Sequence, residues 1–304
     1  MKSKSALMVL VAAVAAIWGT PATARGQIFE TNYNSNTIGQ YTTSGATVKA
    51  SLFTGLSGPT GIAVSGGNLF VTNYATGTVG EYTTSGTTVN ASLITGLSGP
   101  TGIAVSGGNL FVTNLQGNTI GKYTTSGATV NASLVTGLSQ PWGIAASGGN
   151  LFVTNLQSNS IGEYTTSGDT VNASLITGLS AFVVGIAVSG EDLFVTNLQG
   201  NSVGEYTTAG DTVNASLITG LSEPSGITVS GGNLYVTNSS AGTVGEYTTS
   251  GDTVDASLIT GLDSPYGIAV VPEPSTFTLG ILGALSLAAF RRRLRRKRLA
   301  ALSV

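Results

Sequence analysis

Residues 61–73 read Gly-Ile-Ala-Val-Ser-Gly-Gly-Asn-Leu-Phe-Val-Thr-Asn, and this stretch decides the fold because near-copies of it recur along the chain. Val-Gly-Glu-Tyr-Thr-Thr-Ser-Gly follows at residues 79–86, and Val-Asn-Ala-Ser-Leu-Ile-Thr-Gly-Leu at residues 89–97. One tyrosine marks each copy, with spacings of 41, 41, 41, 42 and 41 residues: Tyr41, Tyr82, Tyr123, Tyr164, Tyr206 and Tyr247. A β-rich period of about 40 residues is typical of a propeller blade.

Each copy predicts four short strands, which in one copy fall at residues 102–105, 109–113, 119–124 and 130–135. Glycine recurs in the connections Ser-Gly-Gly-Asn and Thr-Ser-Gly-x-Thr, where a tight turn needs a positive φ. Helices are not expected, because β-branched residues and glycine are too dense for a 3.6-residue period. The fold class predicted is therefore all-β.

The order of the strands predicts how the ring closes. The first-strand motif occurs six times, beginning at Gly61, Gly102, Gly143, Gly185, Gly226 and Gly267. The repeats nevertheless start on a second strand, at residues 28–32, and end on a first strand, at residues 267–270. One C-terminal strand joined to three N-terminal strands completes a sixth blade and removes free sheet edges. We therefore predict a closed six-bladed β-propeller over residues 25–270, with one-plus-three closure, rather than an open solenoid.

Composition excludes several classes of function. The chain has no cysteine and no histidine, so it lacks thiolate chemistry, the commonest general base and the commonest transition-metal ligand. Within residues 25–270, Arg25, Lys49 and Lys122 stand against thirteen Asp and Glu residues, although the whole chain has a formal charge of −2. A domain with this excess of negative charge is not expected to bind nucleic acid, because it would repel the phosphate groups.

Residues 1–24 predict a secretory signal peptide. Lys2 and Lys4 precede an apolar run from Ala6 to Trp18, and residues 22–24 offer an Ala-x-Ala cleavage site. The run is shorter than the roughly 20 residues that span a membrane. An internal core helix is the alternative, which is disfavoured because nothing amphipathic follows.

The C-terminal residues predict a sorting tail over 271–298, with 299–304 as a cytoplasmic end. An apolar segment at 275–290, expected to be helical, and a basic cluster at 291–298 follow a short motif: Val271, Pro272, Glu273, Pro274, Ser275 and Thr276. Motif, apolar segment and basic cluster in this order resemble the PEP-CTERM signal of exported proteins in Gram-negative bacteria. A nucleic-acid site in the basic cluster is the rival interpretation, which the adjacent apolar segment disfavours.

The resemblance to PEP-CTERM proteins implies partners and a location. The tail would be handled by an exosortase-type sorting machinery and would first anchor the chain in the inner membrane. The propeller would then lie in the periplasm, at the cell surface or outside the cell, in association with exopolysaccharide and biofilm.

The repeats themselves resemble those of NHL-type, gluconolactonase-type and streptogramin-lyase propellers, which share the Gly-Asn-Leu-aromatic-Val-Thr and Ile-Gly stretches. The resemblance covers the whole domain, but a shared fold specifies architecture more than activity. For the lyase it implies a catalytic histidine, which no position here supplies. For the gluconolactonase type it implies a carboxylate and asparagine metal set, and no single-copy constellation here matches one.

Comparison of the copies predicts where a ligand would bind. The turns after the first and third strands are nearly identical, whereas the loops after the second and fourth strands differ and share the opposite face. Such loops on a rigid scaffold commonly carry binding sites. Variable aromatic and amide residues should therefore surround the channel mouth and suit a carbohydrate: Trp142, Phe182, Tyr266, Gln116, Gln157 and Gln199. The alternative is drift after duplication, with the aromatic side chains only plugging the channel.

The function predicted is an exported, non-catalytic propeller that binds or organises extracellular material such as exopolysaccharide, and that is not an enzyme. A metal-assisted hydrolase or lactonase is the alternative, with Glu223 and Asp263 as candidate metal ligands on the same face. A purely structural or protein-docking module is the second alternative. No cofactor is expected. Calcium is the alternative, although the third-turn aspartates lack the Asp-x-Asp-x-Asp spacing of a calcium loop.

Overall fold

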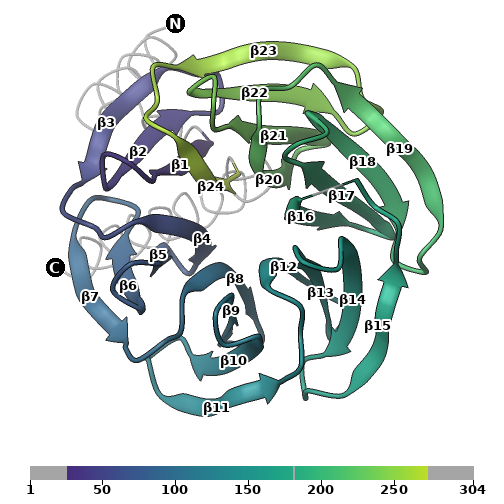
Figure 1. The fold of residues 1–304 in the computed structure, drawn as a ribbon. Helices are drawn as coiled ribbons and strands as arrows, with labels where there is room; N and C mark the ends of the chain where they lie inside the picture. Colours follow the sequence, from purple (N-terminus) through teal and green to yellow (C-terminus); the bar gives the residue numbers. More distant parts are fainter. Residues whose placement is uncertain (1–25, 181, 273–304) are drawn as a thin grey trace, which may run out of the picture. The chain divides into compact units, whose positions relative to one another are not determined.

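The computed structural model describes residues 26–180 and 182–272, which form a ring of six four-stranded antiparallel sheets (Figure 1). Every regular element in these ranges is a strand. The prediction of an all-β, closed six-bladed propeller is confirmed. The predicted signal peptide, and the predicted tail beyond Pro272, lie outside the described residues. Within the described ranges, no helix has the length and apolar character needed to cross a membrane.

We number the blades in chain order and give the strands of each from the channel outward. Blade 1 comprises β4 (Pro59–Ser65), β5 (Asn68–Asn73), β6 (Thr78–Thr83) and β7 (Thr88–Ile94); blade 2, β8 (Pro100–Ser106), β9 (Asn109–Asn114), β10 (Thr119–Thr124) and β11 (Thr129–Val135); blade 3, β12 (Pro141–Ser147), β13 (Asn150–Asn155), β14 (Ser160–Thr165) and β15 (Thr170–Ile176). Blade 4 comprises β16 (Val183–Ser189), β17 (Asp192–Asn197), β18 (Ser202–Thr207) and β19 (Thr212–Thr219); blade 5, β20 (Pro224–Ser230), β21 (Asn233–Asn238), β22 (Thr243–Thr248) and β23 (Thr253–Thr260).

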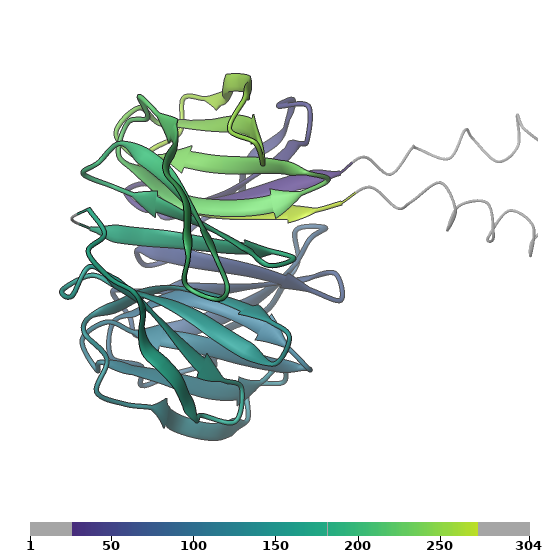
Figure 2. The same ribbon diagram turned by 90° about the vertical axis from the view of Figure 1, so that its right-hand side faces the viewer.

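Blade 6 joins the two ends of the described chain. Its innermost strand is β24 (Pro265–Val271), which pairs with β1 (Gln27–Asn32), followed by β2 (Thr37–Thr42) and β3 (Thr47–Phe53). Gln27 stands opposite Val271, so the first residue of the predicted sorting motif is the last residue of a propeller strand. The one-plus-three closure is confirmed, and Figure 2 shows β1 and β24 side by side.

The two faces of the ring differ in kind. The turns after the first and third strands of each blade lie on one face, which we call the constant face, and the other loops lie on the mouth face. Because β24 ends and β1 begins on the constant face, both ends of the described chain leave the propeller there.

The hydrophobic core lies between neighbouring blades. Each second strand is buried along nearly its whole length. Its aromatic residue packs against the next blade, as Phe29 does against Leu69 and Val71. Phe111 packs in the same way against Leu151 and Val153. The core is therefore a ring of interblade layers, and no blade can bury its apolar side chains alone.

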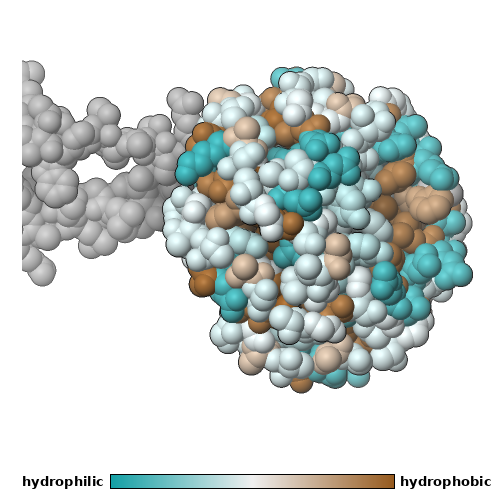
Figure 3. Space-filling model, turned by 60° about the vertical axis from the view of Figure 1, so that its left-hand side comes forward, coloured by the Kyte–Doolittle hydropathy of each residue, from teal (hydrophilic) through white to brown (hydrophobic). Residues whose placement is uncertain are grey.

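The outermost strands form an exposed rim. Each has one roughly half-exposed valine: Val48, Val89, Val130, Val171, Val213 and Val254. Figure 3 views the propeller from the side of β3 and β7 and shows small hydrophobic areas separated by residues of intermediate or hydrophilic character.

A closed ring of threonine hydroxyls links the blades around the channel. The six residues are wholly buried and stand at one position of each second strand: Thr31, Thr72, Thr113, Thr154, Thr196 and Thr237. Each hydroxyl accepts from the first-strand glycine N–H of its own blade at 2.7–2.8 Å. Each also donates to a first-strand carbonyl of the next blade at 2.6–2.9 Å. Each hydroxyl thus satisfies a backbone group on both sides of one blade contact.

The same contact explains the first-strand glycines. A side chain at Gly61 would collide with the carbonyl of Thr101 in the next blade, and one at Gly267 with the carbonyl of Thr60. Equivalent collisions would occur around the ring. Glycine is therefore required here by close approach of two backbones rather than by a positive φ.

Blade 6 buries a carboxyl group at a second-strand position where the other blades have valine. Glu30 stands where their second strands have valine, as at Val71 and Val112, and it is wholly buried. Asn32 Nδ2 donates to Glu30 Oε1 at 2.7 Å, whereas Oε2 has no hydrogen-bond partner among the described residues. The carboxyl lies over Gly39 beside the Tyr41 hydroxyl. Burial raises the pKa of Glu30 to about 8, although the hydrogen bonds that the carboxyl accepts lower this pKa in part. The pKa of the Tyr41 hydroxyl is also raised, first by burial and then by the neighbouring Glu30.

Replacing a threonine of the ring by the isosteric valine should weaken the whole fold. Thr113→Val leaves the Gly102 N–H without its side-chain partner and leaves the Trp142 carbonyl with only the Thr101 hydroxyl as a side-chain donor. The expected cost is about 1–3 kcal/mol of unfolding free energy. The exposed Thr129→Val is the matched control and should change stability by less than about 0.5 kcal/mol. Urea unfolding of both variants is the measurement, and equal midpoints would contradict a structural role for the ring.

Glu30 should make stability fall as pH rises. Below its ordinary pKa of 4.5 the carboxyl is protonated in both states. Between there and about 8 it ionises only when unfolded, so the unfolding free energy falls by up to about 1.4 kcal/mol per pH unit and then levels off. Glu30→Val, which copies the other blades, should remove this slope and stabilise the protein most above pH 8. Denaturant unfolding at pH 5, 6.5 and 8.5 tests this, and parallel profiles for the two proteins would refute it.

Candidate functional site

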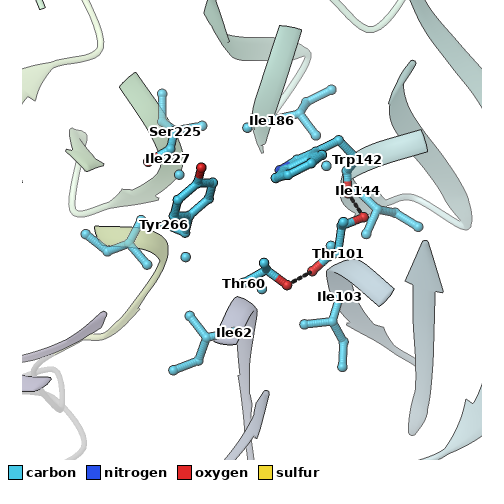
Figure 4. Close-up of a pocket in the computed structure, with 17 residues that line it drawn as sticks. Thr60, Ile62, Thr101, Ile103, Trp142, Ile144, Ile186, Ser225, Ile227 and Tyr266 are labelled. Atoms are coloured by element: carbon cyan, nitrogen blue, oxygen red, sulfur yellow. Dashed lines mark hydrogen bonds between the residues drawn. The ribbon is translucent and has the colours of Figure 1, made fainter. Parts of the chain in front are cut away.

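Two aromatic rings close the mouth of the channel. Trp142 on β12 and Tyr266 on β24 come from opposite blades, 3 and 6, and their ring centroids are 6.1 Å apart at an interplanar angle of 35°. Figure 4 shows both rings pointing into the cavity at the channel axis, which the isoleucines of the first strands also line. Side chains that meet from opposite blades span the channel.

The space around these rings is small. The axial cavity has a volume of about 80 Å³ and is lined by first-strand residues such as Thr60, Thr101 and Ser225 (Figure 4). A water molecule takes roughly 30 Å³ of liquid volume, so this cavity holds a few waters and no sugar ring. A larger ligand must therefore lie on the outer faces of the aromatic rings.

A third ring extends the pair into a strip. The Tyr33 ring lies 5.3 Å from that of Tyr266, at 45°. Tyr33 follows β1 in the variable loop of blade 6, and sequence reasoning missed it as a site residue, although its aromatic side chain in a variable loop was visible. Trp142, Tyr266 and Tyr33, all half-buried, form what we call the aromatic strip.

An acidic pocket adjoins the aromatic strip. It has a volume of about 400 Å³, and its walls include Glu223, Asp263, Asn34 and Tyr266. Asn34 Nδ2 lies 3.4 Å from Asp263 Oδ1, in a long hydrogen bond. Burial, Tyr33 and Glu223 raise the pKa of Tyr266. The two acids predicted as neighbours on this face therefore line one pocket, and Tyr266 is the wall that it shares with the axial cavity.

The backbone that leads into the first strands is strained at four non-glycine positions. The residue three before each first-strand glycine is Gly58 in blade 1 and Gly99 in blade 2, and each has a positive φ. Side chains occupy the corresponding position in the other blades with φ of 53°, 62°, 52° and 56°: Gln140, Phe182, Glu223 and Ser264. This conformation costs a non-glycine residue roughly 1–2 kcal/mol, and such strain concentrates at functional sites.

The preceding blade supports this strained rim. Asn201 Oδ1 accepts from the Glu223 N–H at 2.8 Å, and Asn118 Oδ1 from the Gln140 N–H at 2.9 Å. Both asparagines themselves have positive φ. The rim is thus fixed by interblade hydrogen bonds rather than by contacts of its own side chains.

The remaining predicted residues lie apart from the aromatic strip. Phe182 is 44% exposed at the rim and does not line the axial cavity. Gln116 Nε2 donates to the Tyr74 hydroxyl at 3.1 Å, while Gln157 and Gln199 are exposed on second-strand loops. The structure therefore brings Trp142 and Tyr266 together and leaves the other four predicted ligand-binding residues outside that pair.

Glu223, Asp263 and Asn34 bring two carboxylates and an amide to the acidic pocket. Nowhere in residues 26–180 and 182–272 do three His, Cys, Asp or Glu residues come together to hold a metal ion. The side chains of this pocket can take part in hydrogen bonding and proton transfer.

Comparisons with known proteins identify related sequences and folds. The model of the virginiamycin B lyase family matches residues 8–286. A search of curated proteins finds no match. Among solved structures, a chain of the nidogen–laminin complex has a TM-score of 0.69 at 20% identity, over 81% of this chain and 98% of that one. A streptogramin B lyase has a TM-score of 0.60 at 24% identity, over 82% of this chain and 92% of that one.

Two further structures concern enzymes with the same fold. A catalytically inactive histidine-to-alanine variant of virginiamycin B lyase from Staphylococcus aureus, solved with quinupristin, has a TM-score of 0.60 at 24% identity, over 83% of this chain and 94% of that one. A gluconolactonase from Xanthomonas campestris has a TM-score of 0.59 at 16% identity, over 69% of this chain and 79% of that one.

The comparisons correct one prediction. The expectation that the protein is not an enzyme is wrong, because the matching family is named for a lyase and similar folds include a lyase and a gluconolactonase. The missing histidine and cysteine exclude particular catalytic groups, but carboxylates and phenols are still available for catalysis.

Proposed function

The chain belongs to the virginiamycin B lyase family, and we propose that it binds extracellular polysaccharide on the mouth face of its propeller. The observation that carries this proposal is the aromatic strip of Trp142, Tyr266 and Tyr33 beside the acidic pocket. The flat faces of sugar rings pack on aromatic rings, and hydroxyl groups can donate to Glu223 and Asp263.

The shape of the site favours a polymer over a small molecule. Pockets for small ligands usually enclose most of the ligand surface in 300–1,000 Å³ of mainly apolar space. Here the axial cavity of about 80 Å³ is too small, and the acidic pocket of about 400 Å³ is lined mainly by polar residues rather than apolar ones. The strip lies on the outside of the molecule. A polysaccharide chain running across the mouth face would use the strip without entering the channel.

Cleavage of the bound polysaccharide is a second candidate function, favoured by family membership and by the two carboxylates of the acidic pocket. Glycoside hydrolysis commonly uses one carboxylic acid and one carboxylate. Because the chain has no histidine, the general acid and base at the mouth would have to be Glu223, Asp263 or Tyr266.

The sorting tail supplies the proposed location. Both ends of the described propeller leave from the constant face, so attachment through the tail would leave the mouth face open to extracellular material. Export through the inner membrane and processing by an exosortase-type machinery bring the protein to the polysaccharide that we propose as its ligand.

Binding can be followed through a single tryptophan. In a chain of residues 26–272, Trp142 is the only one, so its fluorescence should change saturably as exopolysaccharide fragments are added. Loss of a ring that packs on the ligand should weaken binding about tenfold, equivalent to 1.4 kcal/mol. Calorimetry should therefore show weaker binding by Trp142→Ala and near-normal binding by Phe182→Ala, an aromatic residue outside the strip.

The same fragments test the second candidate function. If the protein cleaves them, Glu223→Gln or Asp263→Asn should lower release of reducing ends by about 100-fold or more while calorimetric binding persists.

Equal binding losses in Trp142→Ala and Phe182→Ala would contradict the strip as the binding surface. Binding without any product from the wild-type protein would leave the binding function and remove the cleavage function.

Export should depend on the motif at the end of the propeller. In a Gram-negative host with an exosortase, we expect mass spectrometry of the mature protein to find residues 1–24 removed and a C-terminus near 271–276. Deleting the exosortase should leave the basic cluster attached and the protein in the inner-membrane fraction. Recovery of an intact N-terminus or a cytoplasmic protein would refute the proposed route.

A further inference from the structure

The two acids of the acidic pocket depart from the repeat. Glu223 stands where blade 3 has Gln140, and Asp263 stands where blade 3 has Ser139. No other blade has an acid at either position. Glu223 precedes the first strand of blade 5 and Asp263 that of blade 6, yet both line one pocket. Two separate departures from the repeat therefore meet at a single place on the mouth face.

The space of this pocket comes from a third departure. The residue that follows the second strand is tyrosine or leucine in five blades and is Ser239 in blade 5. In blade 6 this residue is Tyr33, whose ring lies so close to Gly58 of the next blade that a Cβ there would stand 3.2 Å from it. Ser239 is too short to cover the equivalent Ser264 in this way, and both serines line the pocket. Blade 5 thus leaves open a space that a larger side chain fills elsewhere.

The protein fixes the backbone of Glu223 and leaves its side chain exposed. The Glu223 N–H donates to Asn201 Oδ1 at 2.8 Å, and the Glu223 carbonyl accepts from the Ser239 hydroxyl at 2.9 Å. Asp263 is held through its own N–H, which donates to Asn32 Oδ1 at 2.9 Å. Both carboxylates therefore stand on anchored backbone beside the pocket.

The charges around the pocket are all of one sign. Residues 123–272 contain eleven Asp and Glu residues and no Lys or Arg. The two lysines of the described ranges lie in other blades, Lys49 on β3 and Lys122 on β10. The local field therefore attracts a cationic group of a ligand and repels an anionic one.

The wall that the pocket shares with the aromatic strip indicates which cation fits. Tyr266 lines the pocket, and its ring lies 5.3 Å from that of Tyr33. Ammonium groups are attracted to the faces of aromatic rings, and each can donate several hydrogen bonds to carboxylates. A sugar packed on Tyr266 would direct the substituents at the edge of its ring toward Glu223 and Asp263.

We propose that the polysaccharide bound on the mouth face contains amino sugars with free amino groups, and that the ammonium group of one such sugar donates to Glu223 and Asp263. This inference rests on the proposed binding function and adds to it the chemical class of the ligand. An N-acetylated amine has no charge and a uronate has a negative one, so neither gains the charge-assisted hydrogen bonds of the pocket.

Calorimetry of the full-length protein with three matched sets of oligosaccharides tests this proposal. The sets are β-linked glucosamine oligosaccharides, their fully N-acetylated counterparts, and uronate oligosaccharides of the same length, at a mildly acidic pH that protonates the amines. The free amines should bind about five- to tenfold more tightly than the acetylated set at low salt, and the uronates should bind most weakly. Added salt should reduce this preference, because it screens the charges.

The repeats supply substitutions that the fold already accepts. Glu223→Gln copies Gln140, which has nearly the same positive φ, and Asp263→Ser copies the serine of blade 3. Each should lower affinity for the free amines toward that for the acetylated set and no further, because the aromatic strip is unchanged. Ser239→Leu keeps both charges but fills the pocket, so it should also reduce the preference. Asp255→Asn, which removes an acid on the outer strand β23, is the control and should leave the preference unchanged.

The outcomes separate this inference from the function on which it rests. Equal affinity for free and acetylated amines, both weakened by Trp142→Ala, would overturn the inference and leave the proposed binding function in place. A preference that Asp255→Asn reduces as much as Glu223→Gln does would also overturn it, since the cause would then be net charge. Failure to bind these oligosaccharides and exopolysaccharide fragments alike would remove the proposed function itself.

Discussion

The hydrogen bond between a threonine hydroxyl and the first-strand carbonyl of the next blade is the constraint on which the structure depends. Repeated six times without a gap, it holds neighbouring first strands so close that only glycine fits between them. This spacing sets the width of the channel. A narrow channel in turn lets Trp142 and Tyr266, from opposite blades, meet across its mouth.

The ring also divides the molecule into two working faces. The mouth face has the strained rim, the aromatic strip and the acidic pocket, whose side chains differ from blade to blade. The threonine ring contacts only the backbone carbonyls of Trp142 and Tyr266, so it does not fix which side chains stand there. The constant face has uniform turns and both ends of the described chain. Both chain ends thus lie opposite the surface proposed to bind polysaccharide. The family to which the chain belongs is named for a lyase.

Much of the fold could be predicted because each repeat contains the sequence pattern of four strands. The last repeat ends after a single first strand, at residues 267–270, and this unpaired strand was enough to predict the one-plus-three closure. The threonine ring could not be predicted, since Thr72 looks like an ordinary strand residue and its partner Thr101 lies 29 residues away in the next blade. At the site, Trp142 and Tyr266 were predicted because they depart from the repeat. Phe182 departs from it too, but its backbone has a positive φ and its side chain is exposed at the rim, a conformation invisible in sequence.

Hydrogen exchange with and without bound polysaccharide would test most directly whether the mouth is the working face. The account predicts that the ligand protects backbone amides in the loops around residues 140–142, 223–225 and 263–266, and leaves the turns around residues 65–68 and 125–127 unchanged. Protection confined to those constant-face turns, or none at saturating ligand, would contradict it.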